Sequence, residues 1–253
     1  MNAIILAAGK GSRLFPLTLT TPKPLINILN TSIIERQIVY LKEIGIDEIC
    51  VVTGHLKDHF KYLKSKFGVT LIFNKEYNVS NNIYSLNACV SFLENTWIIE
   101  GDVFLTKNFL SASLIESTYF TIFKTNLETE WILKFSPKRK LQKILTPPEF
   151  HEKIEYTNGA FCMSGVSYWT SAASKIIKTA LNDYIERATN NESQIKNYYW
   201  DQVVKDNVHK LNIDVKTIVS SDCFEIDTQE DLNNLLLTLK KQEHANNLTL
   251  QTT

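Results

Sequence analysis

Apolar runs alternate with amphipathic segments through the first half of the chain. Residues 2–8 are almost wholly apolar, which predicts a strand buried on both faces, as in a parallel sheet. A capping box at residues 32–35 opens a segment in which Ile34 and Ile38 share one face, and this predicts a helix that ends at Gly45. Similar patterns predict further strands at 49–53, 69–74 and 97–101 and helices at 55–66 and 82–93. Such an alternation predicts a mostly parallel sheet with helices on both faces.

The second half of the chain has a different pattern, with short aromatic-rich segments and few helices between them. These segments predict strands that join the same sheet and fold over the ligand site, at 119–124, 131–136, 141–145 and 161–169. The remaining patterns predict helices at 171–188, 198–208 and 229–241 and a last strand at 223–226. We therefore predict a single α/β domain over residues 1–241, with a mostly parallel mixed sheet, and a polar tail over 242–253 that frays.

Composition excludes several classes of protein. The 253 residues contain 27 Lys plus Arg and 27 Asp plus Glu, and a net charge of zero argues against broad binding to nucleic acid or to an anionic membrane. The 4 cysteines lack Cys-x-x-Cys spacing, which indicates buried thiols rather than a disulfide framework or a zinc site. The amino-terminal apolar run is too short for a signal peptide, and no run is long enough to span a bilayer. A cytoplasmic protein is therefore expected.

A glycine-rich turn follows the first predicted strand and brings positive charge with it. Gly9 and Gly11 let the backbone turn sharply and expose its N–H groups, and Arg13 and Lys23 add cationic side chains. No Gly-Lys-Ser/Thr closes the turn, which excludes the Walker A motif. Leu14 stands where the dinucleotide-binding fingerprint needs its third glycine. We predict that this turn binds a polyphosphate.

Other polar residues also follow predicted strands, where ligands bind in open α/β sheets. Asp102 and Asp227 each follow a predicted strand at its carboxyl end. A nucleoside triphosphate brings Mg²⁺, which is usually held by one or two carboxylates together with phosphate oxygens. We predict that these two aspartates share the metal. Contacts to the base or ribose are predicted from the loops and the helix start after the other strands, at Thr53, Gly54, Asn82 and Ser85.

Two groups of motifs resemble known enzymes. The string LAAGKGSRL at residues 6–14, with PKPL at 22–25, resembles the signature of nucleotidyltransferases that activate sugar phosphates and phosphorylated alcohols. A closer resemblance, to the bacterial CTP:phosphocholine cytidylyltransferases, covers nearly the whole chain up to about Leu239. Its main segments are NIYSL at 82–86, Glu130-Trp131 and YYWDQVVKDN at 198–207. Residues 100–102 are Glu-Gly-Asp where that family implies Asp-Ala-Asp, so a ligand role is carried over to Asp102 only.

The resemblance implies a Rossmann-like nucleotidyltransferase fold and the transfer of CMP from CTP to phosphocholine, with Mg²⁺ as cofactor. We expect Arg13, Lys23 and Asp102 to be catalytic, and Asp102 and Asp227 to hold the metal. The predicted nucleotide-binding residues are Leu6, Ala7, Ala8, Gly9, Gly11, Ser12, Arg13, Lys23, Thr53, Gly54, Asn82 and Ser85. A quaternary ammonium is held by aromatic faces and carboxylates. The residues implied for the acceptor are Trp131, Tyr199, Trp200, Asp201 and Tyr84, with Lys124 for its phosphate.

Other functions fit part of the pattern. The amino-terminal motif suits a sugar-1-phosphate nucleotidyltransferase equally well. Another phosphorylated amine or amino acid, such as phosphoglutamine, is an alternative acceptor for a cytidylyltransferase. A non-catalytic nucleotide sensor is an alternative of a different class, although retention of both cationic residues and both aspartates argues against it. The expected partners are CTP and a small phosphomonoester, without nucleic acid or membrane, and a homo-oligomer is left open.

Overall fold

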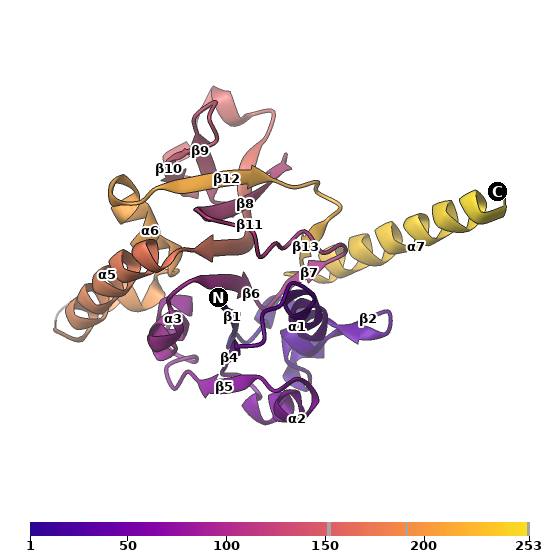
Figure 1. Ribbon diagram of the computed structural model, residues 1–253, viewed down its shortest axis with the longest axis horizontal. Coiled ribbons are helices and arrows are strands. Elements are labelled where there is room, and N and C mark those ends of the chain that lie inside the picture. Colours follow the sequence, from indigo (N-terminus) through magenta and orange to yellow (C-terminus); the bar gives the residue numbers. More distant parts are fainter. Residues whose placement is uncertain (151–152, 191, 252–253) are drawn as a thin grey trace.

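The computed structural model describes residues 1–150, 153–190 and 192–251, and its centre is a nine-stranded mixed sheet (Figure 1). The first half of the chain supplies four parallel neighbours in the order β6-β1-β4-β5. These strands are β1 (Asn2–Ala7), β4 (Ile49–Thr53), β5 (Thr70–Phe73) and β6 (Thr96–Glu100). Every position of β1 and β4 is buried, as their unbroken apolar runs predicted.

The second half of the chain extends the sheet beyond β6. It adds β8 (Ser117–Lys124), β9 (Ile132–Phe135), β10 (Leu141–Leu145), β11 (Ala160–Trp169) and β12 (Ile213–Thr217). β11 runs antiparallel to β6, β8 and β9, and β10 runs antiparallel to β9. The other strands described in this sheet share one direction, so the predicted mostly parallel mixed sheet is confirmed. β11 bends at Gly165, whose φ is 74°, and its register with β8 shifts there.

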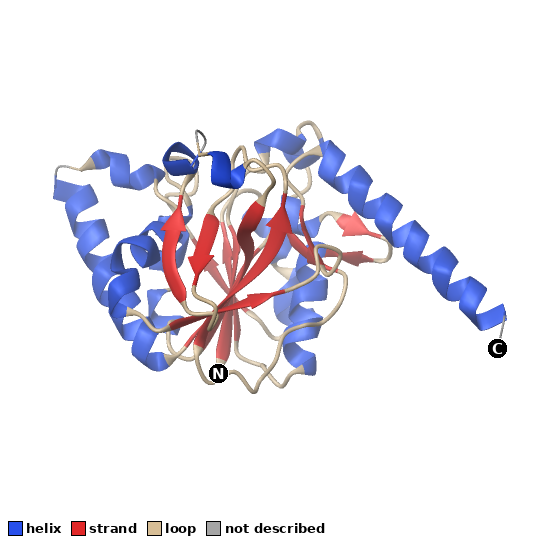
Figure 2. Cartoon of the chain, turned by 90° about the horizontal axis from the view of Figure 1, so that it is seen from above, coloured by secondary structure: helices blue, strands red, loops and turns tan. Residues whose placement is uncertain are grey.

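Helices cover both faces of the sheet (Figure 2). They are α1 (Ile33–Glu43), α2 (Tyr62–Phe67), α3 (Asn82–Ala88), α4 (Pro147–Phe150), α5 (Ser171–Asn190), α6 (Asp201–Asn207) and α7 (Gln229–Gln251). α3, α5 and α6 pack on the face that carries Ile4 and Leu6 of β1, and α1 and α2 pack on the face that carries Ala3 and Ile5. None of the helices in the described part of the chain is long and apolar enough to cross a membrane.

Some elements differ from the sequence predictions. The helix predicted at 55–66 is divided into the 3₁₀ turn η4 (Lys57–Phe60) and α2, and it begins after Leu56, which adopts a left-handed conformation with φ 49°. α7 continues through residues 242–251, where a frayed polar tail was predicted, and Figure 1 shows it projecting away from the body of the molecule. That stretch contains no Gly or Pro to end a helix. β12 was not predicted.

A two-stranded ribbon outside the main sheet joins distant parts of the chain. β7 (Val103–Leu105) pairs antiparallel with β13 (Cys223–Glu225). The Ile226 N–H donates to the Asp102 carbonyl oxygen at 3.0 Å and extends this pairing. The ribbon therefore places the residues just before β7 beside those just after β13. A second small ribbon pairs β2 (Asn27–Ile28) with β3 (Thr31–Ser32).

Candidate active site

The glycine turn after β1 forms one wall of a cavity of about 240 Å³. Gly11 has a φ of 62°, and a Cβ at this position would lie 3.0 Å from the Lys23 Cβ and 3.1 Å from the Thr18 Cγ2. A larger residue would therefore be strained and crowded here, which explains the glycine. The cavity collects most of the predicted nucleotide-binding residues, namely Leu6, Ala7, Ala8, Gly9, Gly11, Ser12, Arg13, Lys23, Asn82 and Ser85.

The Lys23 ammonium lies between the two predicted metal ligands. Its Nζ is 2.8 Å from Asp102 Oδ2 and 2.6 Å from Asp227 Oδ1, and an Arg13 nitrogen is 2.7 Å from the same Asp227 oxygen. Burial alone would lower the pKa of Lys23, but the two carboxylates raise it above its ordinary value. Burial alone would raise the pKa of Asp227, but Lys23 and Arg13 lower it. Lys23 and Asp227 are therefore both charged at neutral pH.

A third carboxylate, that of Glu225, joins the two aspartates, although the sequence analysis did not select it. Ligand oxygens of Asp102, Glu225 and Asp227 lie within 4.8 Å of one another. Burial and the nearby Asp102 raise the pKa of Glu225 to about 7. Glu225 and Asp227 stand two residues apart where β13 ends, so an extended chain turns both side chains to one face, and this spacing was the available signal. Three oxygen donors gathered at one point fit a hard divalent cation such as Mg²⁺.

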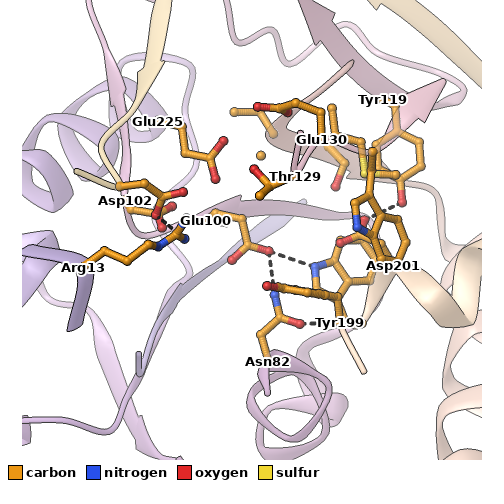
Figure 3. A pocket seen from close by; sticks show the side chains of 17 residues that line it. Arg13, Asn82, Glu100, Asp102, Tyr119, Thr129, Glu130, Tyr199, Asp201 and Glu225 are labelled. Atoms are coloured by element: carbon orange, nitrogen blue, oxygen red, sulfur yellow. Dashed lines mark hydrogen bonds and ion pairs between the residues drawn. The ribbon is translucent and has the colours of Figure 1, made fainter. Parts of the chain in front are cut away.

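A larger cavity of about 440 Å³ shares Asp102 and Asp227 with the first. Figure 3 shows the side chains that line this larger cavity. The rings of Trp131 and Tyr199 stand edge to face on its wall, with centroids 5.8 Å apart. Asp201, at the start of α6, also lines this cavity. The structure thus brings four of the implied acceptor residues, Trp131, Tyr199, Trp200 and Asp201, together beside the nucleotide pocket.

Charge distinguishes the larger cavity from the rest of this neutral protein. Its lining includes a single guanidinium, that of Arg13, and six carboxylates, those of Glu100, Asp102, Glu130, Asp201, Glu225 and Asp227. Lys23 and Lys124 pair with four of these acids from outside the lining and offset part of their charge, but acids still outnumber bases, and this excess favours a negative potential in a confined space. The cavity therefore favours a ligand that carries positive charge.

Glu100 connects the two cavities through hydrogen bonds that the sequence analysis did not predict. Its Oε1 accepts from Asn82 Nδ2 at 3.1 Å and from Trp200 Nε1 at 3.0 Å. The Asn82 side-chain oxygen accepts from the Trp200 backbone N–H at 2.8 Å. Burial and the nearby carboxylates raise the pKa of Glu100 well above its ordinary value. These bonds hold the start of α3 against the start of α6, so the walls of the two cavities keep a fixed relation.

Four of the predicted ligand-binding residues are not among the described residues that line either cavity, namely Thr53, Gly54, Tyr84 and Lys124. Thr53 is buried, and its hydroxyl donates to the Ile72 carbonyl oxygen at 3.3 Å. Gly54 packs under the glycine turn, where a Cβ would lie 2.4 Å from the Ala8 carbonyl oxygen. Tyr84, a residue of α3, is partly buried and packs against the hydrophobic core. These residues pack beneath the residues that line the cavities. Their predicted contacts with ligands stay predictions.

Lys124 also lies behind the cavity wall. Its Nζ is 2.6 Å from Glu130 Oε1 and 3.4 Å from Glu225 Oε2, both of which face the cavity. Burial alone would lower the pKa of Lys124, but Glu225 and Glu130 raise it. The ammonium therefore pairs with two acids, and its predicted contact with the acceptor phosphate stays a prediction.

Comparisons with known proteins place the chain in a family. Residues 2–124 match the nucleotidyl transferase family model. The choline-phosphate cytidylyltransferase of Streptococcus pneumoniae is 37% identical over 243 residues, which cover 96% of this chain and 100% of that protein. The 2-aminoethylphosphonate cytidylyltransferase of Lancefieldella rimae is 31% identical over 235 residues, which cover 91% of this chain and 90% of that protein.

A solved structure agrees with these matches. The structure of the CTP:phosphocholine cytidylyltransferase from Streptococcus pneumoniae aligns with a TM-score of 0.84 at 36% sequence identity. The alignment covers 94% of this chain and 98% of that chain, so the similarity includes both cavities and not only the glycine turn. The predicted fold and family are confirmed. This chain belongs to the family of bacterial choline-phosphate cytidylyltransferases.

Proposed function

We propose that the protein transfers CMP from CTP to phosphocholine, which yields CDP-choline and pyrophosphate. One observation carries the proposal: an aromatic, acidic cavity opens beside the glycine-turn cavity, and the two share Asp102 and Asp227. A triphosphate on the glycine turn and the phosphate of an acceptor in the larger cavity would meet at these acids. The name of the Streptococcus pneumoniae relative supports the choice of CTP and phosphocholine.

The chemistry needs alignment and charge neutralisation more than proton transfer. A phosphomonoester loses its second proton with a pKa of about 6, so its oxygen is a nucleophile at neutral pH. This oxygen attacks the α-phosphorus of CTP. A new P–O bond forms while the bond from the α-phosphorus to the bridging oxygen breaks, and pyrophosphate leaves with the bonding electrons. Lys23, Arg13 and the N–H groups of the turn orient the phosphates and offset their charge.

The cationic end of phosphocholine fits the larger cavity. A quaternary ammonium cannot donate hydrogen bonds, and each contact with an aromatic face contributes about 0.5–2 kcal/mol. Tyr199 is 47% exposed and Trp131 is half-buried, so both present ring surface, and Asp201 supplies a carboxylate. Trp200 is only 2% exposed, so it forms the back of the wall rather than a free face.

In this proposal Asp102, Asp227 and Glu225 hold the divalent cation. Their oxygens are the ligand type that Mg²⁺ prefers, and they converge where the two cavities meet. Bound there, Mg²⁺ supplies a fixed positive charge for the phosphates. Glu225 thereby extends the predicted pair of ligands to three.

Release of pyrophosphate tests the proposal directly. Purified protein is mixed with Mg²⁺, one nucleoside triphosphate and one acceptor, and the acceptors include phosphocholine, phosphoethanolamine, 2-aminoethylphosphonate, phosphoglutamine and glucose 1-phosphate. We expect the highest kcat/KM with CTP and phosphocholine. Preference for 2-aminoethylphosphonate would instead support the second candidate function, for which the Lancefieldella rimae relative is the specific observation. Binding of CTP without turnover of any acceptor would indicate a sensor.

Substitution of one acid by its amide tests the assigned chemistry. Asp102→Asn keeps the shape of the side chain but removes a charge from the acid cluster, so we expect turnover to fall by about 100-fold or more. Asp47→Asn is the matched control, because Asp47 is exposed and pairs only with Lys42 among the described residues. A folded Asp102→Asn variant with the turnover of this control would contradict the assignment.

A further inference from the structure

Asp201, the carboxylate predicted to bind the acceptor, has a buried tyrosine as its partner. The Tyr119 hydroxyl donates to Asp201 Oδ1 at 2.7 Å, and both residues line the larger cavity (Figure 3). Tyr119 lies on β8 and is 3% exposed, whereas Asp201 lies at the start of α6. The hydrogen bond therefore connects the central sheet to the helix that carries the acceptor-binding carboxylate.

The Tyr119 ring has little freedom to move. It packs edge to face on Trp169 with ring centroids 5.2 Å apart, and Trp169 packs in the same way on Trp200 at 5.8 Å. All three rings belong to one buried cluster beneath α5 and α6. Side chains in such a close-packed core keep one rotamer, so the sheet sets the position of the hydroxyl. A carboxylate that accepts from this fixed donor is held in one orientation.

We propose that Tyr119 is a positioning residue for acceptor selection, whose hydroxyl aims the Asp201 carboxylate at the positively charged amine of the acceptor. This inference rests on the proposed function. The hydroxyl bonds to one carboxylate oxygen, Oδ1, and so orients the whole group within the cavity. Tyr119 acts through Asp201 and does not reach the reacting phosphates. Its loss should therefore weaken acceptor binding without slowing the chemical step.

The same hydrogen bond also favours the charged form of Asp201. Burial raises the pKa of Asp201 to about 7, and the Tyr119 hydroxyl opposes that rise. Among the described residues, Glu100 of β6 interacts electrostatically with this carboxylate, and Glu130 of the loop before β9 and Tyr199 line the same cavity. Without the hydroxyl the pKa of Asp201 rises further. More of the carboxylate is then neutral at pH 7, and a neutral group attracts no cation.

The test compares Tyr119→Phe with Tyr184→Phe by steady-state kinetics with CTP and phosphocholine. Tyr184 is the matched control, because its buried hydroxyl donates to Asp206 at the other end of α6, away from the cavity. We expect Tyr119→Phe to raise the KM for phosphocholine about 10-fold, as for a lost hydrogen bond to a charged group. The KM for CTP and kcat should stay within about two-fold of wild type, and Tyr184→Phe should change none of the three.

The pH profile provides a second readout that a purely structural role would not move. In wild type, kcat/KM for phosphocholine should decrease as the pH falls through about 7, because Asp201 becomes protonated. In Tyr119→Phe this decrease should begin at a higher pH. Phosphocholine itself titrates near pH 6, but it does so identically with both proteins. The difference between the two profiles therefore reports on the protein.

A double-mutant cycle with Asp201→Asn completes the test. It also distinguishes a specific effect through Asp201 from a general loss of folding in Tyr119→Phe, because a folding defect would persist in the double variant. If Tyr119 acts through Asp201, Tyr119→Phe should add little to the KM for phosphocholine once the carboxylate has been removed. An unchanged KM in Tyr119→Phe, additive effects in the cycle, or an equal rise in Tyr184→Phe would overturn the inference alone. A wild-type protein that does not turn over phosphocholine would overturn the proposed function and this inference with it.

Discussion

Replacement of Lys23 by methionine should make the stability of the protein depend on divalent cations. The Lys23 side chain is 9% exposed, and its partners Asp102 and Asp227 are 27% and 19% exposed, so solvent screens these ion pairs only weakly. Removal of one partner from a buried pair costs about 3–5 kcal/mol of the free energy of unfolding. Arg13 still contacts Asp227, so we expect the lower end, about 3 kcal/mol. At about 2–4 °C per kcal/mol, the Tm should fall by about 6–12 °C.

Thermal unfolding followed by circular dichroism, in EDTA and in excess Mg²⁺, measures this effect. In EDTA the acid cluster of Lys23→Met is left without its ammonium, and Mg²⁺ should restore much of the lost Tm. Wild type should respond less to Mg²⁺, because its own ammonium competes for the same oxygens. Lys42→Met, which removes a more exposed ion pair with Asp47, is the control. An unchanged Tm in EDTA would refute the stabilising role of Lys23, and a loss that Mg²⁺ does not restore would refute the metal assignment.

Three further predictions follow from other contacts. Trp131→Ala should raise the KM for phosphocholine about 2–30-fold, as for one lost cation–π contact, and initial rates should show no matching rise for CTP; equal rises would indicate a packing role. Gln37 is fully buried and donates to two backbone carbonyl oxygens beside the Asp102 turn, at 2.9 and 2.7 Å, so Gln37→Leu should lower the free energy of unfolding in urea by about 1–3 kcal/mol. An unchanged urea midpoint would contradict this. Burial alone would raise the pKa of Glu149, but the Lys205 ammonium and Thr146 lower it to about 2. The folded pKa thus lies below the unfolded one, so this contact stabilises the protein above about pH 4.5 and the stabilisation is lost towards pH 2. Lys205→Ala should flatten the dependence of Tm on pH within that window, and a slope equal to that of wild type would argue against the contact.

Elements with a strong local cause could be predicted from the sequence. The apolar runs of β1 and β4 are buried as expected, and the Ser32 hydroxyl accepts from the Glu35 N–H at 3.3 Å in the predicted capping box. α1 ends just before Gly45, whose φ is 81°. The elements that were missed depend on distant partners. β12 exists because it pairs with β8, and β7 is a three-residue strand that is too short for any periodicity to show.

For the candidate site, the sequence indicated where residues lie in the sheet but not how their side chains are oriented. The position of a residue after a strand indicates the edge of the sheet at which it lies, and this rule placed Asp102 and Asp227 correctly. It does not indicate which way a side chain points. The ion pairs of Lys124 with Glu130 and Glu225 therefore could not be predicted from the sequence. The roles of Glu100 and Tyr119 could not be predicted. Each depends on a hydrogen-bond partner that lies on another element, 100 residues away for Glu100 and 82 residues away for Tyr119.

The β7–β13 ribbon also determines the stage of biosynthesis at which the cluster of Asp102, Glu225 and Asp227 can form. Synthesis proceeds from the amino terminus, so the glycine turn and Asp102 leave the ribosome long before Asp227. A nascent chain that lacks β13 has the glycine turn and Asp102 but neither Glu225 nor Asp227, and its β7 has no partner strand. Under the proposed function, the three acids come together only after β13 has been synthesised, so activity depends on a late step of biosynthesis.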